Sequence, residues 1–212
     1  MIPPKIHQIV LGNARAPQID QFMSGWRQFS TCSYHRWDDA AAALIFLESF
    51  PEYLDLYRQA RNPAEASDIA RLAILCLHGG YYIDWDIELL DPTAMAGFME
   101  SHHNEHGWAV VDSSNESIAN ELLAFAPGSE LLLSFLRHLS GVPVSQRPPT
   151  PQFSGPWGFT EWYRRSGYSL RLFETCELFQ FRYRYDLCPT KGQPMVHHWM
   201  HTWLEGSPFY IS

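Results

Sequence analysis

Three carboxylates recur at every second position near the middle of the chain, as Asp84, Asp86 and Glu88. If residues 81–89 form a strand, these side chains point to one face, because successive side chains of a strand alternate between faces. Carboxylates gathered on one face repel one another unless a cation lies among them, and their hard oxygen atoms suit Mg²⁺ or Mn²⁺. The spacing therefore predicts a divalent metal site. From the D-x-D tripeptide alone, a solvated edge strand is an equal alternative.

A pair of opposite charges, Asp68 and Arg71, lies three residues apart in a segment with helical signals. Side chains at this spacing share one helix face, where an exposed ion pair contributes roughly a few tenths of a kcal/mol. The planar guanidinium of Arg71 could also hold Asp68 with one edge and a sugar or phosphate with another. Taken alone, the two residues favour the surface ion pair.

The segment that carries this pair has clear start and stop signals. An N-cap, a proline for the first helical position and the acid of a capping box follow one another as Asn62, Pro63 and Glu65. Gly79 and Gly80 can take up the left-handed conformation that ends a helix. The sequence therefore predicts a helix over residues 63–78 and a strand over residues 81–89.

The rest of the chain alternates between strand and helix patterns. Strands are predicted over residues 5–11, 34–37, 107–111 and 118–125, and helices over residues 19–29, 40–48 and 129–139. Asp38 or Asp39 can cap the second of these helices. We interpret the proline-rich residues 143–151 as a long loop and the aromatic residues 173–185 as strand-like. The alternation predicts an α/β sheet.

Composition excludes several classes of protein. Hydrophobic residues make up 46% of the 212 residues and charged residues 18%, which is typical of a globular protein with a substantial core. The net charge of −8 argues against binding to a phosphate backbone, so no nucleic-acid partner is expected. The longest apolar run, residues 40–47, is far shorter than the roughly 20 residues of a membrane span.

The four cysteines, Cys32, Cys76, Cys176 and Cys188, show no regular spacing. A chain of this length does not need disulfides for stability, so we interpret all four as reduced. The first residues lack the pattern of a signal peptide. Together these features predict a cytoplasmic protein, with peripheral membrane association still open.

The residues around the charged pairs form one long pattern, which reads S-D-x-x-R over residues 67–71 and G-G-x-Y-x-D-x-D over residues 79–86. It closely resembles the D-x-D sugar-binding glycosyltransferases of glycosyltransferase family 32, which are related to the initiating α-1,6-mannosyltransferase of yeast. It is more distantly similar to the clostridial glucosylating toxins. The resemblance extends to I-H-Q-I at residues 6–9, S-G-P at residues 154–156 and the ending H-H-W-M-H-T-W at residues 197–203.

This resemblance implies a GT-A fold, with residues 1–212 forming a single Rossmann-like nucleotide-binding domain around a mixed sheet. The implied activity is that of a metal-dependent hexosyltransferase that retains the anomeric configuration. It moves a sugar from a nucleotide-diphosphate donor, either a UDP-sugar or GDP-mannose, to a saccharide acceptor. Polysaccharide biosynthesis is the implied setting, and a protein acceptor is the alternative.

The resemblance also implies roles for single residues. Asp86 and Asp84 hold Mn²⁺ or Mg²⁺ against the diphosphate, and Asp84 also reaches the ribose or the donor sugar. Asp68 binds hydroxyls of that sugar while Arg71 orients sugar or phosphate. Asn120 resembles the family's acceptor-side asparagine.

Both ends of the chain contribute to the implied donor site. His197 is expected as a third metal or phosphate ligand, and Trp203 donates its indole N–H to the diphosphate. The tail, residues 197–212, is expected to act as a lid. Ile9 and Val10 are expected beside the nucleobase. Val10 stands where relatives have tryptophan, which leaves the grip on the base in question.

Three alternatives remain open at this stage. A haloacid dehalogenase-type phosphohydrolase also uses a D-x-D pattern after a buried strand, but after Lys191 the only acid is Glu205. A non-catalytic sugar-binding module would keep the same residues without turnover. His197 and His201 could also form an i,i+4 zinc pair on a helix.

Overall fold

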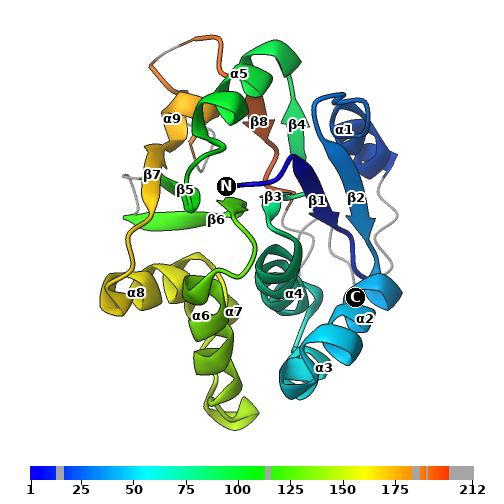
Figure 1. Ribbon diagram of the computed structural model, residues 1–212, viewed down its shortest axis with the longest axis vertical. Coiled ribbons are helices and arrows are strands. Elements are labelled where there is room, and N and C mark those ends of the chain that lie inside the picture. Colours follow the sequence, from blue (N-terminus) through cyan, green and yellow to red (C-terminus); the bar gives the residue numbers. More distant parts are fainter. Residues whose placement is uncertain (13–16, 113–115, 183–186, 190, 201–212) are drawn as a thin grey trace.

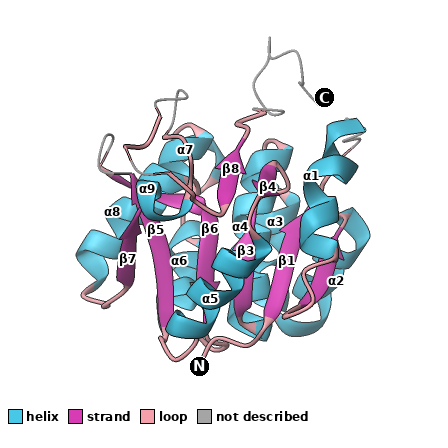
Figure 2. Ribbon diagram, turned by 90° about the horizontal axis from the view of Figure 1, so that it is seen from above, coloured by secondary structure: helices cyan, strands magenta, loops and turns pink. Residues whose placement is uncertain are grey.

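The computed structural model spans residues 1–212 and describes all of them except residues 13–16, 113–115, 183–186, 190 and 201–212. A mixed sheet of six strands runs through its centre, in the order β2-β1-β3-β6-β5-β7. These strands are β1 (Lys5–Ile9), β2 (Ser33–Trp37), β3 (Gly80–Ile83), β5 (Gly107–Asp112), β6 (Ser117–Phe125) and β7 (Arg171–Glu174). Figure 2 shows β7, β5, β6, β3 and β1 side by side.

The sheet joins a parallel half to an antiparallel one. β1 pairs in parallel with both β2 and β3, whereas β6 is antiparallel to its neighbours β3 and β5, and β7 is again parallel to β5. A separate two-stranded antiparallel sheet consists of β4 (Ile87–Leu89) and β8 (Met195–His197). The mixed α/β sheet predicted from the sequence is therefore confirmed.

Helices cover both faces of the sheet (Figure 1). One layer contains α2 (Asp39–Ser49), α3 (Leu54–Arg58), α4 (Pro63–His78), α6 (Glu130–Ser140), α7 (Thr150–Phe153) and α8 (Pro156–Ser166). The other layer contains α1 (Pro17–Arg27), α5 (Pro92–His102), α9 (Thr175–Leu178) and the small sheet. Two short 3₁₀ turns, η1 (Pro51–Tyr53) and η2 (Val144–Gln146), complete the elements. Within the described ranges, no helix has both the length and the apolar character needed to cross a membrane.

Strand β3 divides its side chains between two hydrophobic cores. Tyr81 and Ile83 pack in the core that contains Trp26 of α1, whereas Tyr82 packs in the core that contains Ile69 of α4. This is the alternation expected of a strand buried on both faces.

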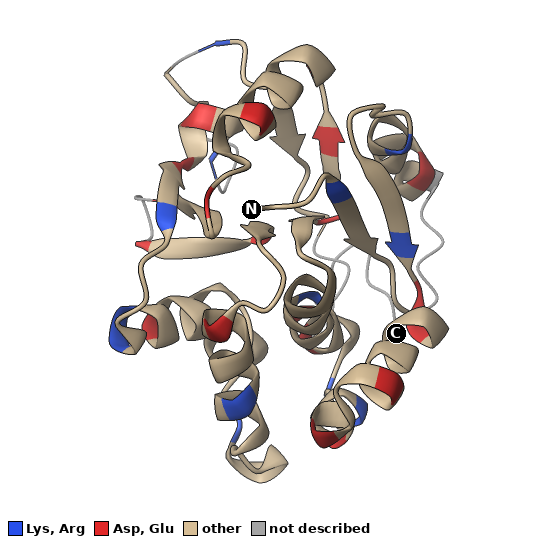
Figure 3. Cartoon of the chain, viewed as in Figure 1, with Lys and Arg blue, Asp and Glu red and all other residues tan. Residues whose placement is uncertain are grey.

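Acidic positions are distributed over helices of both layers rather than gathered at one place (Figure 3).

Helix α4 forms as its capping signals predict. The Asn62 side chain accepts a hydrogen bond from the amide of Glu65 at 2.9 Å, and Pro63 occupies the first turn. Gly79 ends the helix with a φ of +61°, and a Cβ there would lie 2.7 Å from Pro127. Most of the helix is buried, so its polar residues lie inside the protein rather than at its surface.

The predicted strand over residues 81–89 is wrong in one respect that matters for the acidic residues. β3 ends at Ile83 and β4 begins at Ile87. Between them the amide of Ile87 donates to the carbonyl of Asp84 at 3.1 Å, which closes a turn. The carboxylates therefore do not share one strand face. Glu88 lies on the small sheet, where its carboxylate contacts Nε2 of His198 at 2.9 Å.

Two other segments also differ from the sequence prediction. Residues 143–151 are not a loop throughout, because they contain η2 and the beginning of α7. Of the described residues in the aromatic stretch 173–185, only the first two lie in a strand, while Phe179 and Phe181 form isolated β-bridges. Glu174 then forms a reciprocal capping box with Glu177 and starts α9, while residues 183–186 fall outside the described part.

The prediction that all four cysteines are reduced is wrong for two of them. Cys176 and Cys188 form a disulfide, with their Cα atoms 5.3 Å apart. α9 holds Cys176, and the amide of Cys188 donates to the carbonyl of Gln180, which brings the second cysteine back to the helix. A separation of 12 residues carries no signal of this return in the sequence. Cys32 and Cys76 are free.

Candidate functional site

Seven polar residues from four segments meet at the carboxyl ends of β1 and β3. They are Asp68 and Arg71 from α4, Asp84 and Asp86 from the turn after β3, Asn120 and Glu121 from β6, and His197 from β8. This edge is where the parallel strands of an α/β sheet commonly present their ligand-binding residues. The sequence predicted six of these seven residues for functional roles.

Asp68 and Arg71 form a buried ion pair rather than the surface pair considered above. Each residue is 5% exposed, and an Nη2 atom of Arg71 lies 3.2 Å from Oδ1 of Asp68. The side-chain amide of Asn120 also donates to Oδ1 of Asp68 at 2.9 Å, and the Ser154 hydroxyl donates to Oδ2 of Asp68 at 2.8 Å. Burial raises the pKa of Asp68, and Arg71, Ser154 and Asn120 partly oppose that rise.

Arg71 links Asp68 to the acidic turn. Its Nη2 atom lies 3.4 Å from Oδ1 of Asp84, and its guanidinium carbon lies 4.4 Å from the centre of the Tyr82 ring. A second nitrogen donates to the carbonyl of Asn120. Burial opposes the charge of Arg71, but Asp84, Tyr82 and Asp68 together raise its pKa. The guanidinium is thus a fixed positive charge between two carboxylates.

The turn after β3 places Asp84 at the end of the central sheet. Its amide donates to the carbonyl of Glu121 at 2.9 Å, and the hydroxyl of Tyr82 donates to its Oδ1 atom. Burial raises the pKa of Asp84 to about 6, since the favourable charge of Arg71 is offset by the nearby Asp86 carboxylate. Asp84 is therefore poised to gain from any further positive charge beside it.

Asp86 is held by the segment that follows β8. Its Oδ1 atom lies 3.3 Å from Nε2 of His197, its Oδ2 atom accepts from the amide of Met200 at 2.9 Å, and its carbonyl accepts from the amide of His198 at 3.0 Å. Burial alone would lower the pKa of His197, but Asp86, with Glu121, raises it to about 10. The same contact outweighs burial at Asp86 and lowers its pKa.

Asp84, Asp86 and His197 form a group with the donor set of a metal site. One ligand atom from each residue lies within 4.8 Å of the others. The ring atom Nδ1 of His197 is buried and has no hydrogen-bond partner among the described residues. Two carboxylates and one imidazole suit a divalent cation such as Mn²⁺, and the fixed charges nearby leave the two acids only partly neutralised. The residues present therefore fit a divalent ion.

Glu121 is the residue of this edge that sequence reasoning missed. Its carboxylate lies 3.7 Å from Nδ1 of His197, while its carbonyl holds the amide of Asp84. Asn120 and Glu121 are adjacent polar residues that interrupt the apolar run from Ile118 to Phe125, which is the signal that could have drawn attention to them. Both contacts place Glu121 behind the metal group.

Ile9 and Val10 lie at the end of β1 but face different cores. Ile9 packs in the core that contains α4, whereas Val10 packs with Ile19 and Met23 of α1. The half-buried indole of Trp85, between Asp84 and Asp86, packs against this small cluster. Val10 is thus adjacent to the acidic turn, and Ile9 is a core residue.

Other predicted residues fall outside the described part of the chain. These are Trp203, His201 and the predicted lid beyond Met200. The described chain that leads toward them includes β8, which ends at His197. His197 is grouped with two aspartates rather than placed on a helix, as a zinc pair with His201 would require.

Comparisons with known proteins agree with this arrangement. Residues 18–108, which include the charged pair of α4 and the acidic turn, match a family described as glycosyltransferase sugar-binding region containing DXD motif. An uncharacterized glycosyltransferase of Acanthamoeba polyphaga mimivirus is 42% identical over 52 residues, which is 24% of this chain and 21% of the viral protein. The aligned part of the chain thus spans about a fifth of that relative.

Solved structures show the same fold. The PaToxG glycosyltransferase superposes with a TM-score of 0.62 and 15% identity over 78% of this chain and 70% of its own. The ligand-free glycosyltransferase domain of the YGT toxin superposes with a TM-score of 0.50 and 11% identity, over 66% of this chain and 62% of its own. The resemblance to D-x-D glycosyltransferases and the GT-A-like fold are therefore confirmed.

Proposed function

We propose that this protein is a metal-dependent glycosyltransferase that moves a hexose from a nucleotide diphosphate to a saccharide acceptor and retains the anomeric configuration. One observation carries the proposal. The group of Asp84, Asp86 and His197, within 4.8 Å of one another, lies next to the buried pair of Asp68 and Arg71. A set of metal ligands beside the oriented carboxylate of Asp68 suits a ligand that has both a diphosphate and sugar hydroxyls.

Asp84, Asp86 and His197 would hold the divalent ion, Mn²⁺ or Mg²⁺. When bound, the ion offsets the negative charge that develops on the diphosphate as it leaves. The match to a D-x-D family supports this role, as does the donor set of the three residues. Arg71 adds a positive charge that the chain itself supplies and that stays protonated in the buried site.

Asp68 would accept hydrogen bonds from hydroxyls of the donor sugar. Its neighbours Arg71 and Asn120 fix the orientation of the carboxylate, so the sugar meets a preorganised acceptor. The bond from C1 to the diphosphate oxygen breaks with its electron pair on the phosphate. The acceptor oxygen bonds to C1 on the same face, and its proton passes to the leaving diphosphate.

The nucleotide base would lie near Val10, beside Trp85, and the indole of Trp203 would donate to the diphosphate. A UDP-sugar or GDP-mannose is the proposed donor, and polysaccharide assembly at a cytoplasmic membrane face is the proposed setting. We also propose that residues 1–212 form one domain, since both cores share the central sheet. A protein acceptor is the alternative outcome.

The experiment is a donor screen with the purified protein. Thermal stability is measured with UDP- and GDP-sugars, each with Mn²⁺, with Mg²⁺ and with chelator, because a ligand that binds only the folded state raises Tm. Donors that raise Tm are then tested for release of nucleoside diphosphate. NMR compares the anomeric configuration of the transferred sugar with that of the donor.

The proposal expects a Tm increase and turnover that both require the metal ion. Equal turnover in excess chelator contradicts the metal dependence, and an inverted anomeric centre contradicts retention. Donor binding without any turnover, with saccharide or protein acceptors, would instead identify a sugar-binding module. Release of inorganic phosphate from simple phosphate esters would identify the phosphohydrolase alternative, against which the family match already argues.

A further inference from the structure

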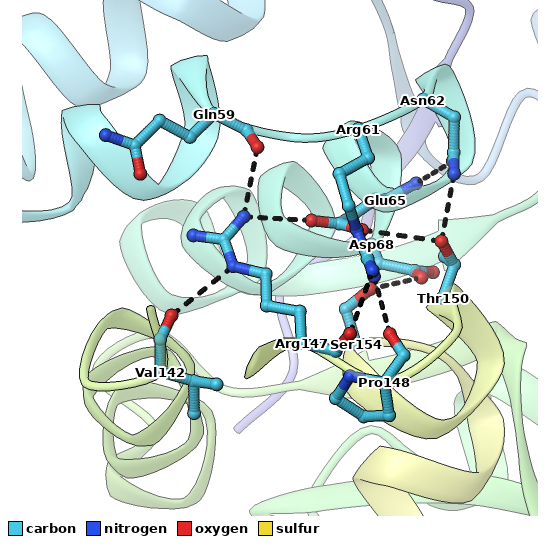
Figure 4. A network of polar contacts seen from close by, with 10 residues as sticks. All are labelled: Gln59, Arg61, Asn62, Glu65, Asp68, Val142, Arg147, Pro148, Thr150 and Ser154. Atoms are coloured by element: carbon cyan, nitrogen blue, oxygen red, sulfur yellow. Dashed lines mark hydrogen bonds and ion pairs between the residues drawn. The ribbon is translucent and has the colours of Figure 1, made fainter. Parts of the chain in front are cut away.

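The segment after α6 is fastened to the first turn of α4 by a buried ion pair. Arg147 and Glu65 are both buried, and Nη1 of Arg147 lies 3.0 Å from Oε1 of Glu65. Arg147 also donates to the carbonyls of Gln59 and Val142. A buried pair with its other hydrogen-bonding positions filled holds one geometry closely. Figure 4 shows how this pair joins the two segments.

Further contacts fasten the same segment on the other side of Glu65. Arg61 binds the second oxygen of Glu65 at 2.7 Å and also donates to the carbonyl of Pro148 at 2.7 Å. The side-chain amide nitrogen Nδ2 of Asn62 donates to the Thr150 hydroxyl at 2.9 Å, at the beginning of α7. The residues that begin α4 thus also set the position of α7.

The short helix α7 delivers Ser154 to Asp68. Ser154 follows Phe153 directly, and its amide donates to the carbonyl of Thr150 at 3.0 Å. The backbone beyond is tightly packed, since a Cβ on Gly155 would lie 2.8 Å from Cα of Pro151. The Ser154 hydroxyl, 2% exposed, donates to Oδ2 of Asp68 at 2.8 Å.

The contacts of Asp68 with its neighbours leave one lone-pair position of its carboxylate without a donor among the described residues. Oδ1 accepts a hydrogen bond from Asn120 and lies 3.2 Å from Nη2 of Arg71, whereas, within the described part of the chain, Oδ2 accepts only from Ser154. A carboxylate offers about four lone-pair positions, so Oδ2 retains one. The serine bond determines which lone pair that is.

We propose that Ser154 is a positioning residue that aims the remaining lone pair of Asp68 at one hydroxyl of the donor sugar. The inference rests on the proposed function, which makes Asp68 a sugar-binding residue. Ser154 acts through Asp68 and does not touch the reacting atoms. The contacts among Arg147, Glu65 and Thr150 keep the Ser154 hydroxyl within hydrogen-bonding distance of Asp68.

The test compares Ser154→Ala and Ser154→Thr with the unaltered protein, using the donor found in the screen. Loss of the hydroxyl is expected to raise KM for the donor about tenfold with little change in kcat, while Ser154→Thr restores most of the affinity. Binding of the nucleoside diphosphate with Mn²⁺, measured by calorimetry, is expected to stay within about twofold. That ligand lacks the sugar and cannot report on Asp68.

Donors that lack single hydroxyls separate positioning from a general structural effect. With the deoxy donor that lacks the hydroxyl bound by Asp68, Ser154→Ala and the unaltered protein should have the same KM. The matched control is Ser134→Ala on α6, which removes a half-buried hydroxyl that bonds to the carbonyl of Leu131 and the indole of Trp162. This control should match the unaltered protein with every donor.

Two outcomes overturn the inference. Equal KM values for Ser154→Ala and the unaltered protein with the full donor show that the serine does not position Asp68. The same KM increase with every deoxy donor shows a structural role only. Absence of nucleotide-sugar binding and turnover by the unaltered protein contradicts the proposed function itself, and the inference falls with it.

Discussion

The imidazole Nε2 atom of His197 lies 3.3 Å from Oδ1 of Asp86, where β8 pairs with β4. The register of these two short strands places His197 opposite Ile87, the residue after Asp86. The metal group therefore depends on contacts between distant parts of the sequence. In this structure the histidine, with its raised pKa, supplies the positive charge that faces Asp86.

Asp86→Asn is expected to weaken binding of Mn²⁺ by at least about 100-fold, because the amide keeps the shape but loses the anionic ligand. The protein should remain folded, since His197 can give up its proton when its partner loses charge. Calorimetric titration with Mn²⁺ measures the affinity, and circular dichroism checks the fold.

Glu88→Gln is the matched control for this variant. The alternating pattern of the sequence would place Glu88 in the metal group, but its carboxylate contacts His198 on the small sheet instead. Its Mn²⁺ affinity should therefore stay within about twofold of the unaltered protein. An equal loss in both variants would contradict the turn after β3 as the feature that selects the ligands.

Arg71→Lys is expected to lower turnover by at least about 100-fold although the charge is kept. A single ammonium group cannot reach Asp68, Asp84 and the carbonyl of Asn120 together, nor cover the Tyr82 ring. Steady-state kinetics measures the effect. Arg164→Lys, at a half-exposed arginine of α8, should show normal turnover. Near-normal turnover of Arg71→Lys would mean that the buried pair is structural only.

Local signals were sufficient for α4, its glycine stop and β3, because capping and strand propensity are properties of neighbouring residues. The same signals failed just beyond Ile83. Trp85 and Ile87 continue the apolar alternation of a strand, yet the chain turns after Asp84, and residues 87–89 pair with the distant strand β8 instead. A tertiary contact overrode the local pattern.

The components of the site were easier to predict than their partners. Asp68, Arg71, Asp84 and Asp86 lie in one motif, and the structure places them together. The proposed role of Ser154 depends on contacts between segments more than 80 residues apart in the sequence. Ser154 and Asp68 themselves are separated by 86 residues. No local propensity encodes such a distance. The disulfide of Cys176 and Cys188, only 12 residues apart, escaped prediction because their spacing does not show that the chain returns to α9.

Gly80→Ala is expected to destabilise the protein by about 2–3 kcal/mol or more. Gly80 has a φ of +105°, and a Cβ there would clash with the carbonyl oxygen of Lys5 on the adjacent strand β1. Gly128→Ala is the control, because its φ of +75° carries a similar backbone cost while no atom lies within 4 Å of the added Cβ. Urea unfolding measures both variants, and equal losses would contradict the steric account.

His7 is expected to make the stability of the protein depend on pH. Its ring is buried, Nε2 donates to the carbonyl of Gly79 at 2.9 Å, and Nδ1 accepts from the Trp37 indole at 3.1 Å. The bond from Trp37 requires the neutral ring, because a protonated ring has no acceptor at Nδ1. Burial is the main cause that lowers the pKa of His7 from 6.5 to about 3, whereas the hydrogen bond to Gly79 opposes it.

Between pH 6.5 and about 3, the unfolded chain therefore binds a proton at His7 that the folded protein does not. The stabilisation from a neutral His7 is fully present above pH 6.5 and is lost as the pH falls toward 3, at about 1 kcal/mol per pH unit. Urea unfolding at pH 7, 6 and 5 measures this loss as the slope of the unfolding free energy against pH, which should correspond to uptake of roughly one proton on unfolding. His7→Gln keeps a donor for Gly79 but cannot titrate, so its stability should be lower at pH 7 and should fall less steeply on acidification. An unchanged slope in His7→Gln would assign the acid sensitivity to other groups, such as the partly buried His78, whose pKa burial also lowers.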